Sequence, residues 1–403
     1  MDMSAVRNDF PTIRKKDGVY LDSACQSLRP DRVIRAVLEY YEDFPTCGGR
    51  SIYKMSAKVS AVTDEAREKA AEFFGTDDPD CYVFTKNCTE GINTVAKGCV
   101  LKKGDAVVTT DTEHNSNNVP WAVLSEEIGI KRRYSISGED GGFSIENFKN
   151  AMGKDVKMVS IHHVNNVTGC VVPIKEVAEI AHDVGAKVLI DGSQAAPHMK
   201  VDLKKADVDF YSLSVHKMLG PSGMGILYGK REALEGIRPL TTGGGAVGLV
   251  THDHADLAPI PNKFEAGLQN YSGIAGTKAA LDYLTDVGME RVLEHDRMLM
   301  RSIFKRTDGI NGLSLVGPDD PDRRCGVFSF NIGGLSPHDI AMTLDKIDNI
   351  MIRSGQHCAH PFFASRGIEG SARASVYLYN NEEDIERFAS ALRKVAEKFG
   401  SGR

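Results

Sequence analysis

Several strands predicted in this 403-residue chain end in polar side chains that can do acid–base chemistry or bind anions. The set comprises a carboxylate, a histidine, two asparagines, a serine–histidine–lysine group and a threonine at a helix start: Asp191, His114, Asn165, Asn166, Ser214, His216, Lys217 and Thr89. In open parallel sheets, ligands bind where the carboxyl ends of the strands meet. A helix start adds backbone N–H groups that bind anions. We therefore expect these side chains to line one site.

This set meets the needs of pyridoxal 5′-phosphate (PLP). The cofactor requires a carboxylate at its pyridinium nitrogen, a lysine that forms a Schiff base with its aldehyde, and a site for its phosphate. Taken singly, each residue has an ordinary interpretation, because an aspartate after a strand usually caps a turn and a lone lysine is usually solvated. The combination favours PLP, with Lys217 as the residue that anchors it.

The elements that must position these residues alternate between short β-rich runs and amphipathic stretches. Strands are predicted at 82–85, 106–109, 157–162, 187–190, 210–214 and 225–228. Helical periodicity is clearest at 89–98 and 174–183, and two further helices are predicted at 31–43 and 57–74. This alternation predicts an α/β fold with a mostly parallel sheet covered by helices.

Past about residue 275 the pattern changes to that of a smaller α+β domain. Its predicted elements are helices at 276–286 and 289–305, strands near 326–331 and 372–377, and a closing helix at 382–398. The chain length suits two domains. We expect a large PLP-binding domain at 20–285 and a small domain formed by 1–19 and 286–403.

The composition argues against several function classes. The net charge is −6 and basic residues form no long runs, so nucleic-acid binding is not expected. No stretch approaches eighteen uninterrupted apolar residues, and the first eighteen residues are polar, unlike a secretory signal. We expect a cytoplasmic protein. The eight cysteines form no C-x-x-C pair or cluster, so we expect no metal site and interpret seven of them as small buried residues.

The chain resembles class V aminotransferases, and most closely the SUF-type cysteine desulfurase and selenocysteine lyase branch. Matching segments run in order along nearly the whole chain: Tyr20-Leu21-Asp22-Ser23-Ala24, Thr89-Glu90-Gly91-Ile92-Asn93, Val119-Pro120-Trp121, Asp191-Gly192-Ser193-Gln194, Ser214-Val215-His216-Lys217, Lys263-Phe264-Glu265-Ala266-Gly267 and Arg373-Ala374-Ser375. The resemblance implies the PLP-dependent transferase fold (fold type I), with a seven-stranded sheet in the large domain. It also implies a homodimer in which residues around 240–270 approach the neighbouring subunit's active site.

The resemblance implies a role for each matched residue. Lys217 would bind the cofactor and move the substrate Cα proton, which requires a lowered pKa. Asp191 would pair with the pyridinium nitrogen, and Arg373 would bind the substrate carboxylate through its bidentate guanidinium. The remaining matches would contact the ring (His114, Gln194, Asn166) or the phosphate (Thr89, Ser214, His216).

The reaction depends on Cys358, in the segment 353–361. In the desulfurases this place holds the nucleophilic cysteine that removes sulfur from L-cysteine, leaving L-alanine and an enzyme persulfide. The attacking species is a thiolate, so His357, His360 or the helix start nearby would lower the thiol pKa. A protein sulfur acceptor or scaffold, as in iron–sulfur cluster assembly, would receive the sulfur.

Alternative interpretations remain open at this point. Cys358 could be one more buried cysteine, or could form a metal site with His357 and His360, although that spacing is tight for one tetrahedral ion. The reaction could be selenocysteine lysis, cysteine sulfinate desulfination, transamination or epimerisation. A scaffold without turnover would have no need of Lys217 or Asp191, and both are present.

The chain departs from its relatives at three positions. Gln356 stands where they often have histidine, so acid–base assistance from that position is lost. Leu268 replaces a threonine that would reach across the dimer to the partner's phosphate, and it cannot donate that hydrogen bond. Tyr53 also stands where a histidine is common. These changes concern substrate fit and acceptor preference, and leave the cofactor residues intact.

Overall fold

A seven-stranded sheet forms the centre of the computed structural model, which describes residues 3–49 and 51–400. The strand order is β2-β8-β7-β6-β5-β3-β4. The bounds are β2 (Tyr82–Thr85), β3 (Ala106–Thr110), β4 (Lys131–Ser135), β5 (Val156–His162), β6 (Lys187–Asp191), β7 (Phe210–Ser214) and β8 (Gly225–Gly229). Strand β8 runs in the opposite direction to the other six strands. The predicted mostly parallel α/β sheet is confirmed.

The one strand of this sheet that sequence reasoning missed is β4, at its edge. Its sequence is Lys-Arg-Arg-Tyr-Ser, and only the last of these residues is buried. Edge strands often carry charged side chains because one side faces solvent, so the apolar signature of a buried strand is absent.

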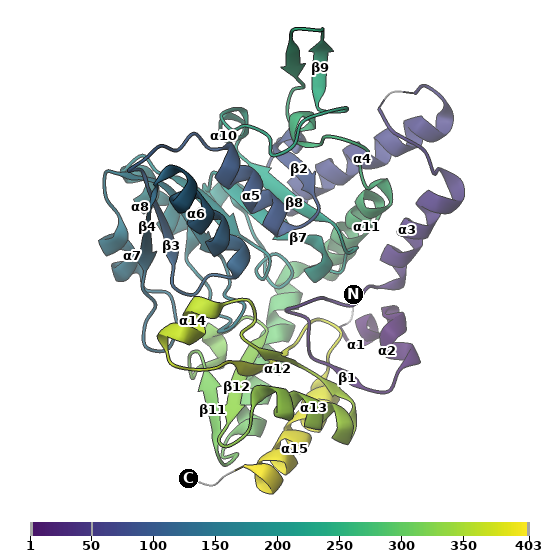
Figure 1. Cartoon of the computed structure of the whole chain (residues 1–403). Helices are drawn as coiled ribbons and strands as arrows, with labels where there is room; N and C mark the ends of the chain where they lie inside the picture. The colour runs from purple at the N-terminus through teal and green to yellow at the C-terminus, as the bar shows by residue number, and fades with distance from the viewer. Residues whose placement is uncertain (1–2, 50, 401–403) are drawn as a thin grey trace.

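Helices cover both faces of the sheet (Figure 1). Their bounds are α3 (Asp31–Asp43), α4 (Lys54–Phe73), α5 (Cys88–Gly98), α6 (Asn115–Ile128), α8 (Ile174–Asp183) and α11 (Tyr271–Val287). The contact between α5 and β7 is close: a Cβ on Gly91 would lie 2.2 Å from Ser212 Oγ. Because only glycine allows this approach, the start of α5 is held beside the carboxyl end of β7.

A second, smaller sheet has four antiparallel strands in the order β11-β12-β15-β14. Its elements are β11 (Leu313–Val316), β12 (Val327–Ile332), β14 (Arg353–Gly355) and β15 (Ser371–Ser375), with helices α12 (Met289–Thr307), α13 (Pro337–Asp348) and α15 (Glu382–Phe399). Most of these elements contribute to a hydrophobic cluster of their own, which also includes Val19 and Leu21. The predicted smaller α+β part is present, and the domain boundaries stay a prediction.

The N-terminal segment joins this smaller part through β1 (Val19–Tyr20), which pairs in parallel with β13 (Ile350–Met351). The chain then continues past the large sheet toward α3 (Figure 1). Residues 21–29 therefore lie between the two sheets, although nothing in their periodicity predicts this.

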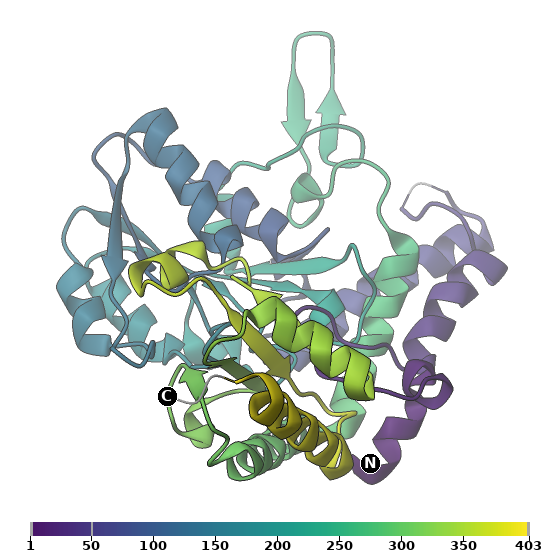
Figure 2. The ribbon, with the colours of Figure 1, turned by 60° about the horizontal axis from the view of Figure 1, so that its bottom comes forward.

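A hairpin of β9 (Val247–Val250) and β10 (Ala255–Leu257) projects from the body in both views (Figures 1 and 2). The remaining short helices are α1 (Met3–Val6), α2 (Pro11–Lys15), α7 (Ile145–Ala151), α9 (Leu203–Ala206), α10 (Arg231–Glu235) and α14 (His360–Ser365). Within the described ranges, no helix has the length and apolar character that crossing a membrane requires.

Candidate active site

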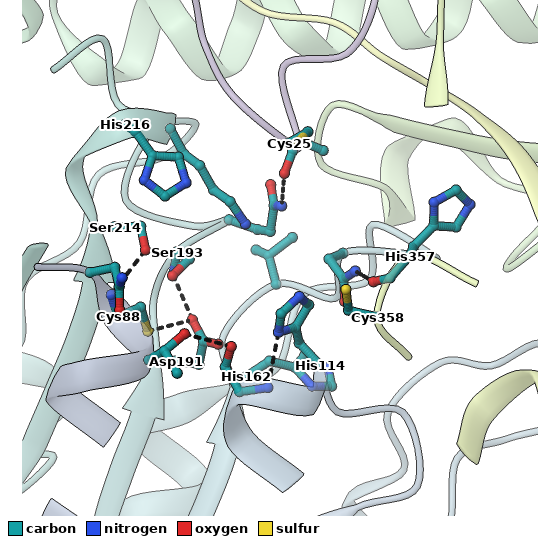
Figure 3. Close-up of a pocket in the computed structure, with 18 of the residues that line it drawn as sticks. Cys25, Cys88, His114, His162, Asp191, Ser193, Ser214, His216, His357 and Cys358 are labelled. Atoms are coloured by element: carbon teal, nitrogen blue, oxygen red, sulfur yellow. Dashed lines mark hydrogen bonds between the residues drawn. The ribbon is translucent and has the colours of Figure 1, made fainter. Parts of the chain in front are cut away.

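A cavity of about 290 Å³ lies between the carboxyl ends of the large-sheet strands and the loop that follows β14 (Figure 3). It brings together ten residues singled out from the sequence: Thr89, His114, Asn166, Asp191, Gln194, Ser214, His216, Lys217, Cys358 and Arg373. Asn165 is not among its lining residues. Its Oδ1 instead accepts from the backbone N–H groups of Val167 and Thr168, both at 2.8 Å, and shapes the turn.

Asp191, at the end of β6, is buried and held by two donors on one oxygen. Asp191 Oδ1 accepts from the backbone N–H of Ser193 at 2.9 Å and from Cys88 Sγ at 3.2 Å. Burial and the Asp191 charge raise the pKa of the Cys88 thiol well above its usual value. The thiol therefore stays protonated and acts as a hydrogen-bond donor. The carboxylate therefore has a fixed orientation at the cavity wall.

Lys217 lies in a short 3₁₀ turn directly after β7. Burial lowers the pKa of its amine, and the Asp191 carboxylate opposes part of that shift. A lysine with a lowered pKa is more readily available as the neutral amine, the form that attacks a carbonyl and accepts a proton.

His114 caps the start of α6. Its Nδ1 accepts from the Ser116 backbone N–H at 3.1 Å, which leaves the ring proton on Nε2. Burial, and then the charge of Lys217, lower the pKa of His114 to about 4. The ring is therefore neutral near pH 7 and presents an N–H donor.

Hydroxyl groups and backbone N–H groups gather at the start of α5. Ser214 Oγ accepts from the Cys88 backbone N–H at 2.9 Å, and the hydroxyls of Thr89 and Ser116 lie 2.7 Å apart. His216 lines the same end, and burial followed by the Lys217 charge lowers its pKa to about 4. These groups can supply hydrogen bonds to an anion.

Cys358 is exposed and lies in a loop with unusual backbone geometry. His357 and Cys358 have φ angles of 48° and 56°, in the left-handed region that non-glycine residues rarely adopt. Two hydrogen bonds hold this conformation: Asn166 Nδ2 donates to the His357 carbonyl at 2.8 Å, and the Asn115 N–H donates to the Cys358 carbonyl at 2.7 Å. The thiol is thereby kept at the cavity border.

His357 does not provide the positive charge that was expected near the thiol. Burial, and then the charge of Arg373, lower the pKa of His357 to about 2, and its Nε2 lies 2.9 Å from Ser371 Oγ. His360 Nδ1 accepts instead from Asn115 Nδ2 at 2.8 Å. Across the described ranges, no three His, Cys, Asp or Glu side chains are arranged to hold a metal ion.

Two arginines from neighbouring strands frame the end of the cavity near the N-terminal segment. Arg373 on β15 is buried and donates through Nη1 to the Asn166 carbonyl at 2.8 Å. Arg353 on β14 pairs with Asp22 Oδ2 at 2.7 Å and donates to Cys25 Sγ at 2.7 Å. Sequence reasoning missed Arg353, Asp22 and Cys25 as parts of the site, although the first two lie within segments that it quoted.

The expectation that seven cysteines are small buried residues was wrong. Of the eight, four are buried, Cys25 and Cys99 are partly exposed, and Cys47 and Cys358 are exposed. Cys88 is buried but serves the site through Asp191. A strand end followed by a cysteine at a helix start was the signal available for Cys88.

The residues present fit PLP. In the described part of the chain, Gln194 Oε1 and Arg373 Nε are buried polar atoms without a protein partner, and both residues line the cavity. Gln194 is oriented by its Nε2, which donates to the Ala24 carbonyl at 2.7 Å. Buried polar atoms without partners are rare, so a polar ligand is expected to satisfy them.

Comparison with known proteins supports this interpretation. The profile of the Aminotransferase class-V family matches residues 19–388. The chain is 37% identical over 407 residues to a probable cysteine desulfurase of Halalkalibacterium halodurans, with 99% of each chain covered, and 35% identical over 419 residues to a cysteine desulfurase of Haloferax volcanii, covering 99% of this chain and 98% of that one.

Solved structures agree. The apo cysteine desulfurase of Thermococcus onnurineus matches with a TM-score of 0.94 and 34% identity, over 98% of both chains. The cysteine desulfurase CsdA of Escherichia coli, in an S-sulfonic acid form, matches with a TM-score of 0.92 and 30% identity, over 99% of both chains.

Proposed function

The chain belongs to the aminotransferase class-V family and is a cysteine desulfurase, and from that premise we propose that Lys217, Asp191 and Cys358 carry its reaction. The observation that supports this assignment best is that the cavity lined by Lys217 and Asp191 is also bordered by the exposed thiol of Cys358. The substrate is L-cysteine and the products are L-alanine and a persulfide.

PLP, when bound, supplies an electron sink that makes the substrate Cα–H acidic and activates the Cβ–S bond. Asp191 is suited to hold the ring nitrogen in its protonated form, because Ser193 and Cys88 fix the carboxylate. The hydroxyls of Ser214 and Thr89, with His216, are suited to the phosphate.

Lys217 would hold the cofactor through its Nζ, and the same atom would move the substrate Cα proton. Its lowered pKa suits both tasks, since each needs the neutral amine for part of the cycle. His114 contributes a neutral ring with an N–H at Nε2. Arg373, with its Nε free of protein partners among the described residues, binds the substrate carboxylate.

Cys358 receives the sulfur. Its thiolate attacks the substrate sulfur, so that the Cβ–S bond breaks and a persulfide forms on Cys358. Because the side chain is exposed, the persulfide is accessible to a protein acceptor. We propose that this acceptor belongs to iron–sulfur cluster assembly, as the resemblance implies.

The test is Cys358→Ser, with Cys47→Ser as the control because Cys47 is exposed but lies outside this cavity. With L-cysteine and a reductant, we expect Cys358→Ser to lose sulfide and alanine formation while keeping the visible absorbance of the lysine-bound cofactor. Activity on cysteine sulfinate should persist, because sulfite leaves without a thiol acceptor. Full desulfurase activity in Cys358→Ser would overturn the assignment.

We also propose that the protein acts as a homodimer. The β9–β10 hairpin and the segment after it expose four large apolar side chains, Leu249, Val250, Leu257 and Leu268. Exposed apolar side chains that gather on a projecting element are typical of protein interfaces. Leu268 is 74% exposed in the single chain and cannot donate the hydrogen bond that a threonine there would provide.

A further inference from the structure

Cys25 is a second thiol at the border of the active-site cavity. It lies on the segment that follows β1, whereas Cys358 lies on the loop after β14, and both line the same space (Figure 3). The Cys25 side chain is partly exposed, so it is accessible from the cavity.

The third cysteine that lines this cavity, Cys88, is of a different kind. Its side chain is buried, its thiol donates a hydrogen bond to Asp191, and burial raises the pKa of that thiol well above the usual value. A thiol held in this way is a poor nucleophile, because the thiolate is the reactive form. Of these two thiols, only Cys25 is therefore in a position to react alongside Cys358.

Arg353 contacts Cys25 and lies on β14, the strand that leads into the loop carrying Cys358. Its Nη2 lies 2.7 Å from Cys25 Sγ and 2.7 Å from Asp22 Oδ2, and it stands five residues before Cys358 in the chain. It is also the direct cross-strand partner of Arg373. Cys25 thus lies beside a guanidinium of the kind that stabilises a sulfur anion, at the end of the cavity where the substrate carboxylate would bind.

The electrostatics of the surrounding residues agree with this position. Burial lowers the pKa of Arg373, and Asp22 followed by Cys25 opposes that shift. Burial likewise lowers the pKa of Lys217, with Asp191 the largest opposing charge and Cys25 a smaller one. Cys25 is therefore within electrostatic range of both the substrate-binding arginine and the lysine.

We propose that Cys25 is a second sulfur-carrying residue, which takes the terminal sulfur of the persulfide formed on Cys358. This inference rests on the proposed function, because it requires that persulfide. In the transfer, Cys25 Sγ forms a bond to the terminal sulfur, the bond between that sulfur and Cys358 Sγ breaks, and the proton of the Cys25 thiol passes to Cys358. One persulfide and one thiol are present before and after, so no external oxidant or reductant is needed.

The relay has a measurable consequence. Once the sulfur has moved to Cys25, Cys358 is again a thiol and can accept sulfur from a second L-cysteine. A subunit without an external acceptor then stores two transferable sulfur atoms instead of one.

The experiment uses the PLP-loaded enzyme and excess L-cysteine without reductant, followed by alkylation and peptide mass spectrometry. We expect one added sulfur on the Cys358 peptide at early times and on the Cys25 peptide later. Cyanide should release about two sulfur atoms per subunit as thiocyanate from the wild type and about one from Cys25→Ser. Cys47→Ser is the matched control and should behave as the wild type.

The possible outcomes separate this inference from the proposed function. Sulfur on Cys358 but never on Cys25 would overturn the relay alone. A disulfide between Cys25 and Cys358 with release of sulfide, or sulfur reaching Cys25 in the Cys358→Ser variant, would also overturn it. Absence of sulfur from both residues would overturn the proposed function and the relay with it.

Discussion

The thiol of Cys88 lies 3.2 Å from Asp191 Oδ1 and donates a hydrogen bond to it. The carboxylate at the centre of the site is thus oriented from α5, the helix whose first residues also line the cavity. The same sulfur lies 3.3 Å from the Ser212 carbonyl, so Cys88 also connects α5 to β7, the strand that leads to Lys217.

We predict that Cys88→Ala weakens PLP binding. Loss of one hydrogen bond to a buried carboxylate corresponds to roughly 1 kcal/mol, or about a fivefold higher dissociation constant. Absorbance titration of the cofactor-free protein with PLP measures it. Cys88→Ser should restore much of the affinity because serine retains a donor, and Cys325→Ala, a buried cysteine outside the cavity, should have no effect. Equal affinities in Cys88→Ala and the wild type would contradict the positioning role.

The side-chain amide of Asn166 is expected to position the loop after β14 that carries Cys358. Its Nδ2 donates to the His357 carbonyl at 2.8 Å, beside two residues in the left-handed region. Without that bond the loop should relax, so Asn166→Ala should form the Cys358 persulfide roughly tenfold more slowly in a single turnover, equivalent to about 1.4 kcal/mol.

Quenched-flow sampling with mass spectrometry of the Cys358 peptide measures this rate. The matched control is Asn147→Ala, which removes a similar amide-to-carbonyl bond of 2.8 Å outside the cavity. An unchanged persulfide rate, or a slowing as large in the control, would argue against the positioning role.

Much of the site was predictable because it lies at strand ends. Asp191 ends one buried strand and Lys217 follows another, and the carboxyl ends of parallel strands must meet at one edge. Cys25 and Arg353 were not predictable in this way. Their contact depends on the N-terminal segment pairing with β13, more than 300 residues away, and hydrophobic periodicity carries no information about such pairings.

The fold shows the same division. The spacing of apolar residues predicted the central strands and most of the long helices, and most of the predicted bounds agree with the structure within a few residues. It did not predict the charged edge strand β4. It also missed α6, because this helix contains Pro120 and a polar first turn. The strand predicted to reach residue 377 ends at Ser375.

The projecting hairpin gives a direct test of the proposed homodimer. Leu249 is 62% exposed in the single chain, and we expect it to be covered by the partner subunit. Leu249→Asp would then bury a charge at the interface and shift the protein toward monomers in sedimentation experiments. The matched control is Val100→Asp, because Val100 is 81% exposed but lies far from the hairpin in sequence. A wild-type monomer, or an unaltered dimer in Leu249→Asp, would exclude this interface.

Buried His163 is expected to make stability depend on pH. Its Nδ1 is hydrogen-bonded to the Tyr211 hydroxyl at 3.1 Å, and burial, with the neighbouring His162, lowers its pKa to about 3 from an ordinary value of 6.5. Between these two values the unfolded chain binds a proton at this residue and the folded chain does not. The free energy of unfolding therefore falls as the pH falls from 6.5 toward 3, by up to about 1.4 kcal/mol per pH unit from this one group.

Replacing this histidine should remove its share of the pH dependence. In urea unfolding of the PLP-loaded enzyme at pH 7, 6 and 5, His163→Asn should be less stable than the wild type at pH 7 because the Tyr211 hydroxyl loses its partner. The difference in the free energy of unfolding should narrow as the pH falls, because only the wild type has the histidine whose lowered pKa destabilises the folded chain in acid. His252→Asn, at an exposed position, should leave both stability and slope unchanged. A constant difference between His163→Asn and the wild type across this range would show that His163 titrates alike in the folded and unfolded chains.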